Sequence, residues 1–79
     1  MGKLYAVKMK IHNAPGSVGF HSVWYSEDEA NRQASLRNKY NGDFAEYFVE
    51  EKTEFTRVTN GFGRPQVRFA DSVGWMEIK

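Results

Sequence analysis

The sequence of 79 residues contains no cysteine, which excludes a disulfide framework and leaves packing of apolar side chains to stabilise the fold. It also lacks an apolar run of the ~20 residues that a membrane-spanning helix needs, and it lacks a secretory leader. We therefore expect an intracellular protein without a membrane segment, located in the cytoplasm.

A dominant charge of one sign is missing as well, because 11 basic residues face 10 acidic ones and the formal net charge is +1. This balance argues against a full mimic of nucleic acid, which needs a strongly negative field. The charge is nevertheless uneven along the chain. Residues 1–25 carry lysines and no acid, residues 26–55 are acidic, and residues 56–79 are basic.

Apolar material is present in an amount that supports a core, with 41% hydrophobic and 15% aromatic residues. A chain of this length has room for one small core, so the sequence predicts a single domain over residues 1–79.

The best-determined element is a helix over residues 26–42. Ser26 and Glu29 have the spacing of a capping box, in which each residue bonds the backbone amide of the other. Gly42 is expected to end the helix in the left-handed conformation that glycine accepts easily. The stripe expected to face the core is narrow and consists of Ala30, Ala34, Leu36 and Tyr40.

The remaining apolar segments alternate in the manner of strands and are separated by turn residues rich in glycine, proline and asparagine. The predicted strands cover residues 3–12, 18–25, 44–49, 55–59, 66–70 and 75–78. The fold prediction is α+β, with a sheet in the order β-β-α-β-β-β. We expect one antiparallel sheet of about four or five strands, with the helix packed on one face.

Alternation also predicts which faces are buried. In the first strand Tyr5 and Val7 begin the core face, which continues through Met9 and Ile11. The opposite face is expected to be mostly wet and comprises Leu4, Ala6, Lys8, Lys10 and His12. In the second strand Phe20 and Trp24 are both expected to point inward. The charged residues 50–54 are expected to continue an edge strand or to form a connection.

No pattern in the sequence predicts catalysis, a metal site or a cofactor. His12 and His21 supply two ligands where a metal site needs three or four, so surface or satisfied histidines are the better interpretation. The glutamates at positions 46, 50, 51 and 54 resemble a solvated face more than an acid–base pair, because so short a chain can hardly enclose a cleft. We expect a protein that is not an enzyme.

Two groups of residues are candidates for binding a partner. Arginine and aromatic residues dominate binding hot spots, which favours Phe62, Arg64 and Arg68 in and beside the late loop. The acidic alternative consists of Glu50, Glu51 and Glu54. A rival hypothesis is single-stranded nucleic-acid binding by Lys8, Lys10, Arg57, Arg64 and Arg68, and a third is an oligomer-forming structural subunit.

Several segments, Leu4-Tyr5-Ala6-Val7-Lys8-Met9, Val23-Trp24-Tyr25, Ser26-Glu27-Asp28-Glu29-Ala30 and Tyr47-Phe48-Val49-Glu50-Glu51, carry a resemblance. They are similar to small accessory proteins encoded by bacteriophages, over about the first two thirds of the chain. The resemblance implies a protein that binds and inhibits a host protein or complex in the host cytoplasm, as anti-CRISPR proteins do. It assigns no functional residue, and the oligomeric state stays open.

Overall fold

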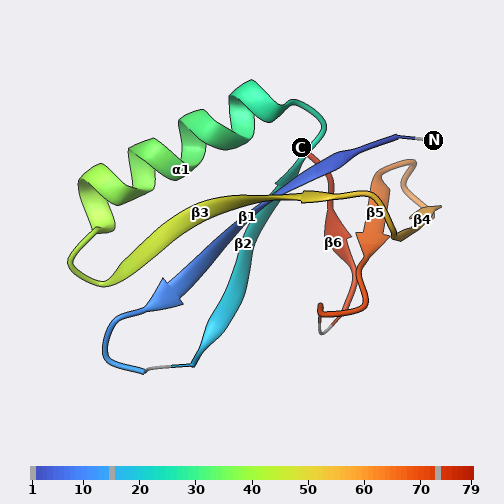
Figure 1. The fold of residues 1–79 in the computed structure, drawn as a ribbon. Helices are drawn as coiled ribbons and strands as arrows, with labels where there is room; N and C mark the ends of the chain where they lie inside the picture. The colour runs from blue at the N-terminus through green and yellow to red at the C-terminus, as the bar shows by residue number, and fades with distance from the viewer. Residues whose placement is uncertain (1, 15, 73) are drawn as a thin grey trace.

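Figure 1 shows the fold in a computed structural model that describes residues 2–14, 16–72 and 74–79. The fold is α+β, as predicted, but four strands follow the helix where the predicted order β-β-α-β-β-β has three. The elements are β1 (Leu4–Ile11), β2 (Val18–Trp24), α1 (Glu27–Asn41), β3 (Ala45–Lys52), β4 (Thr56–Thr59), β5 (Pro65–Arg68) and β6 (Met76–Glu77). No helix in the described ranges is long and apolar enough to cross a membrane.

The prediction of one sheet is wrong, because the strands form two antiparallel sheets of three strands, ordered β2-β1-β3 and β4-β5-β6. The chain end joins them: Ile78 donates its amide hydrogen to the carbonyl of Pro65 in β5, at 3.2 Å, and forms a parallel bridge with Val23 of β2. In Figure 1 the helix covers one face of the first sheet, while the second sheet lies beyond its other face.

Each face of the first sheet therefore has its own core. Under the helix the buried cluster contains Val7, Ala30, Ala34, Ala45 and Tyr47. Between the sheets it contains Leu4, Val23, Val67, Phe69 and Ile78. Strand β1 contributes to both clusters, so the expectation that its second face is mostly wet is wrong. On that face Leu4 and Ala6 are 1% and 0% exposed, and Leu4 packs in the cluster that contains Val67 of the second sheet.

A β-bulge in β2 directs its two aromatic side chains to opposite faces of the sheet. Val7 pairs with Ser22, and the next residue, Lys8, pairs with Phe20, so His21 is the additional residue. Because an extra residue reverses the alternation, Phe20 packs on the core between the sheets while Trp24 packs under the helix. Both aromatic residues point inward, as predicted, but they enter two different cores.

The helix begins as predicted, since the Ser26 hydroxyl accepts the Glu29 amide hydrogen at 3.3 Å. Its end differs, because Gly42 has right-handed helical angles of φ −61° and ψ −24°. A Cβ at Gly42 would clash with the Asn38 carbonyl oxygen, so the position needs glycine for space. Ala30 and Ala34 are buried as predicted, whereas Leu36 and Tyr40 are 40% and 70% exposed.

Strand β3 runs through the charged segment to Lys52, so residues 50–52 continue an edge strand. The outer edge of β3 is partly covered by the helix. The Asn38 side chain donates to the Tyr47 carbonyl at 2.9 Å and accepts the Tyr47 amide hydrogen at 2.8 Å. One amide side chain thereby takes the place of a neighbouring strand at this point.

Candidate functional site

The strongest candidate is the outer face of the second sheet, turned away from the core. Arg57 of β4 lies opposite Val67 of β5, which is fully buried, so both lie on the side of the sheet nearer the core, where Arg57 is nevertheless exposed. The alternate positions face solvent because strand side chains alternate. This outer face contains Val58, Gln66, Arg68 and Glu77, with Thr56 at its margin.

At one end of the outer face, Phe62 occupies the tip of the β4–β5 hairpin. The Asn60 side-chain oxygen accepts the amide hydrogens of Phe62 and Arg64, at 2.9 and 3.0 Å, and Gly63 completes the turn with φ +80°. The predicted loop is thus a hydrogen-bonded turn. It holds the Phe62 side chain 91% exposed, the most exposed of the large apolar side chains described.

At the other end of the outer face, the Arg68 guanidinium lies 5.0 Å from the centre of the Trp75 ring. Trp75 is 41% exposed, and Val58 on the neighbouring strand is 43% exposed. Nearer the hairpin, Arg64 lies 3.4 Å from a carboxylate oxygen of Glu77. The structure therefore places Arg64 and Arg68 on one sheet with exposed apolar side chains.

Sequence reasoning missed Trp75 and Val58. The sequence pattern predicts only a closing strand at Trp75. An arginine and a tryptophan separated by a short turn, as Arg68 and Trp75 are, can stack when the turn reverses the chain. Val58 is the neighbour of Arg57 in β4 and lies on the other face of the strand. Only its pairing with Gln66 of β5 shows that this is the outer face of the second sheet.

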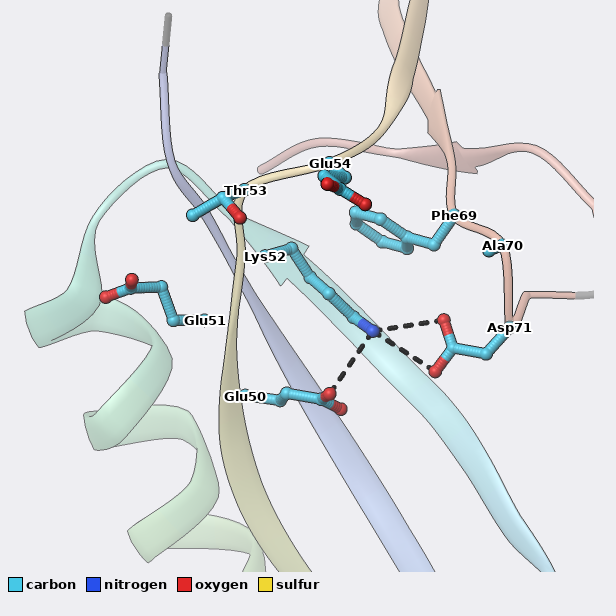
Figure 2. A pocket seen from close by; sticks show the side chains of 8 residues that line it. All are labelled: Glu50, Glu51, Lys52, Thr53, Glu54, Phe69, Ala70 and Asp71. Carbon is cyan, nitrogen blue, oxygen red and sulfur yellow. Dashed lines mark hydrogen bonds and ion pairs between the residues drawn. The ribbon is translucent and has the colours of Figure 1, made fainter.

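The acidic alternative lies elsewhere, around a shallow hollow of about 330 Å³ where β3 leads toward β4. Figure 2 shows its lining, with Phe69 and Asp71 facing Lys52 and Glu54 across it. Glu50 and Glu51 diverge in this view: Glu50 turns toward Lys52, while Glu51 points away from Asp71. Glu51 lies 3.6 Å from the Lys3 ammonium group.

Beside the hollow, two lysines and two carboxylates form one cluster, which we call the charge clamp: Lys8, Lys52, Glu50 and Asp71. Lys8 bonds Glu50 at 2.7 Å and Asp71 at 3.0 Å. Lys52 bonds Glu50 at 3.3 Å and both Asp71 oxygens at 3.0 and 3.1 Å. Asp71 follows β5, so the charge clamp ties the two sheets together.

Two aromatic rings lie against the lysines of the charge clamp. The Lys8 ammonium group lies 5.0 Å from the centre of the Phe20 ring, and that of Lys52 lies 5.3 Å from the centre of the Phe69 ring. Those two rings stack on each other at 5.5 Å. The lysine side chains are only 12% and 13% exposed, so their charges depend on the carboxylates and rings around them.

The protonation states follow from these contacts. Burial disfavours the charged form of Lys8, but its hydrogen bonds to Glu50 and Asp71 outweigh this and raise the Lys8 pKa. Bonding from Lys8 lowers the pKa of Glu50 against the effect of burial. Burial opposes the charge of Asp71 too, but bonds from Lys52 and Lys8 prevail and lower its pKa. Glu50 is therefore engaged within the fold.

The basic set of the nucleic-acid hypothesis is not brought together. Lys8 belongs to the charge clamp. Arg57 is exposed but lies on the opposite side of the second sheet from Arg68, 5.7 Å from the centre of the Tyr25 ring. Arg64 and Arg68 therefore share one face of the second sheet, and neither Lys8 nor Arg57 joins them there.

The two histidines lie in different surroundings. Nε2 of His12 is 2.8 Å from the Gly42 carbonyl oxygen. Nδ1 of His21 is 3.0 Å from the Ser22 hydroxyl oxygen, and the Trp24 indole donates a hydrogen bond to that oxygen at 2.7 Å. Burial, followed by the charges of Arg37 and Lys79, lowers the pKa of His21.

Comparisons of the chain with protein-family models, with curated proteins and with solved structures found no match.

Proposed function

We propose that this is a non-enzymatic binding protein, and that the outer face of the second sheet is its contact surface for another protein. The single observation that carries the proposal is Phe62, whose side chain is 91% exposed at the tip of a hydrogen-bonded turn. Full burial of such a side chain against a partner contributes about 1.5–3 kcal/mol.

The surroundings of Phe62 suit a protein partner. Arg and Trp are the residue types most enriched at binding hot spots, and Arg68 and Trp75 already stack at 5.0 Å. A stacked pair loses less side-chain freedom when a partner covers it than two independent side chains do. Arg64 and Glu77 provide charges of both signs at the margin, which favours specificity over bulk attraction.

In keeping with the resemblance to phage accessory proteins, we propose that binding blocks or modulates a host protein. Nucleic acid is the weaker candidate because Lys8 is engaged in the charge clamp and Arg57 faces away from Arg68. Titration with a single-stranded oligonucleotide separates the two classes. Phosphate contacts would appear as binding that weakens steeply with salt.

The test is affinity capture from a lysate of the cells in which the protein acts, read by quantitative mass spectrometry. The variant carries Phe62→Ser together with Arg64→Ser. Its matched control carries Phe44→Ser with Arg32→Ser, which removes an exposed phenylalanine and an exposed arginine from a different region.

We expect the wild type and the control to capture the same protein, and the Phe62/Arg64 variant to capture at least about tenfold less. Thermal unfolding must show that both variants remain folded. Equal capture by all three folded proteins would contradict the assignment of this face.

A further inference from the structure

The inference starts from the edge of β2 that does not face β1. Over its last residues this edge is covered by the chain end. Lys79 donates its amide hydrogen to the Val23 carbonyl at 2.8 Å and accepts that of Tyr25 at 3.2 Å. The fold therefore already uses this edge to hold an extended segment.

The first half of the same edge has its hydrogen-bonding groups directed outward. In β3 the amide and carbonyl of Tyr47 point away from β1, toward the Asn38 side chain. The backbone groups of the next residue, Phe48, therefore point toward β1, where Phe48 pairs with Lys8. Since Lys8 uses its backbone groups toward β3, its partner on the other side, Phe20, directs its own away from β1.

The same reasoning applies one step along the ladder. Lys10 pairs with Glu46 of β3 on one side and with Val18 on the other, so Val18 also points its amide and carbonyl outward. Among the described backbone groups, no turn or loop hydrogen bond involves those of Val18 or Phe20. Val18 is moreover 48% exposed.

A hollow of about 310 Å³ lies directly beside this free edge. Phe20, Met76 and Trp75 supply its apolar lining, and Asp71 and Ser72 supply polar groups. The volume is at the lower limit of ligand sites in proteins, which suits one large apolar side chain. Its lining joins the free edge of β2 to Trp75, which stacks against the outer-face residue Arg68.

We propose that the edge at Val18–Phe20 binds an extended segment of the partner protein as an added strand, and that the segment places a large apolar side chain in the hollow. This inference rests on the proposed protein-binding function and names the form in which the partner is recognised. In such binding, main-chain hydrogen bonds supply affinity and a pocket beside the edge supplies specificity.

A second copy of this chain suits the edge less well. Its own β2 would offer only the short segment from Val18 to Phe20 for pairing. A stable protein–protein interface buries about 1,200 Å² or more, which so short a pairing cannot provide. An extended segment can instead follow the edge and fill the hollow at the same time.

The probe is a blocked heptapeptide in which threonines alternate with valine and phenylalanine, flanked by lysines for solubility. It is titrated to about 1 mM into the isotope-labelled protein, which is followed by NMR. We expect shifts at the Val18, Gly19 and Phe20 amides and at the Trp75 indole. Hydrogen exchange at the Val18 and Phe20 amides should slow.

Two variants locate the site. Val18→Pro removes an outward amide at the first position of β2, where proline is compatible with a strand, and Trp75→Ala removes one wall of the hollow. We expect each to weaken peptide binding at least about tenfold, the effect of losing one good contact. Thr59→Pro is the matched control, since the Thr59 amide points away from β5 on the outer edge of β4.

Several results would overturn the inference: no shift at the highest peptide concentration, wild-type affinity in folded Val18→Pro, or weakening by Thr59→Pro instead. A mass that rises with protein concentration and disappears in Val18→Pro would identify a second copy as the occupant, also against the inference. The outer-face variant Phe62→Ser/Arg64→Ser should bind the peptide normally, so failure of the proposed contact face is detected separately.

Discussion

Replacing Asp71 by asparagine tests the charge clamp most directly. The change keeps the size of the side chain but removes the negative charge that Lys8 and Lys52 both approach at 3.0 Å. Two ammonium groups would then share Glu50 alone, and both lysine side chains are too buried to recover full hydration. We expect the folded state to lose stability.

The size of the loss lies between two limits. Breaking a fully buried ion pair costs about 3–5 kcal/mol, while an exposed pair contributes about 0–1 kcal/mol. The Asp71 side chain is 46% exposed, so solvent screens its charge, whereas Lys8 is 12% exposed. We therefore expect a loss of about 1–3 kcal/mol, and each 1 kcal/mol lowers Tm by roughly 4–8 °C in a domain of this size.

Lys8→Met provides the matched comparison. It leaves Glu50 and Asp71 with Lys52 alone, and these carboxylate side chains, 41% and 46% exposed, can be hydrated instead. The methionine can also remain on the Phe20 ring through a sulfur contact. The loss should therefore be about 0–1 kcal/mol, smaller than that of Asp71→Asn.

The pH dependence carries a definite sign. The pKa values of Glu50 and Asp71 lie below their ordinary values of 4.5 and 3.8, so their contribution is present above those values and is lost as the pH falls further. The pKa of Lys8 lies above 10.5, so its contribution is present below that value and is lost as the pH rises through the raised pKa.

Urea unfolding, followed by tryptophan fluorescence between pH 2.5 and pH 7, measures the stability of each variant and its loss on the acidic side. The Asp71→Asn variant should lose less stability than the wild type as the pH falls below 4.5, because it lacks one titrating group of the charge clamp. Parallel curves for the two proteins, or a larger loss in Lys8→Met than in Asp71→Asn, would refute the reasoning.

Further predictions concern the edge, the hairpin and the second core. Asn38→Ala leaves the Tyr47 backbone groups on an open edge and should cost about 1–2 kcal/mol, with faster hydrogen exchange at the Tyr47 amide; unchanged exchange would contradict it. Gly63→Ala forces a side chain into φ +80° and should cost about 1 kcal/mol or more in urea unfolding, whereas Gly61→Ala serves as the control. Ile78→Ala should cost about 2–4 kcal/mol and speed exchange in both sheets; wild-type exchange in β4–β6 would argue against a shared core.

Local signals made the helix predictable. The Ser26 cap depends on neighbours three residues apart, and its hydroxyl bonds the Glu29 amide as expected. The buried stripe was only half predicted, because Ala30 and Ala34 touch the sheet while Leu36 and Tyr40 lie on other sides of the helix. Since alanines allow the helix to lie close to the sheet, larger apolar residues nearby are not needed for its core.

The division into two sheets was not predictable from local patterns. Lysines at positions 8 and 10 made one face of β1 resemble a solvated surface, yet Lys8 is covered because Asp71, 63 residues away, meets its charge. The bulge at His21 likewise has no sequence signal, and it decides which core receives Phe20 and which receives Trp24. Both features depend on contacts distant in sequence.

The same long-range contacts bear on where a partner can bind. Covering the first sheet on both sides leaves its core residues unavailable, but the second sheet packs against the core on one side only, within residues 2–14, 16–72 and 74–79. Its uncovered side carries Val58 and Arg68, and Trp75 continues this surface to the hollow beside β2. A partner strand at Val18–Phe20 would therefore approach Trp75 from one side while the outer face contacts the same partner from the other. Trp75→Ala should therefore weaken both the strand contact at β2 and the contact at the outer face, whereas Phe62→Ser should weaken only the contact at the outer face.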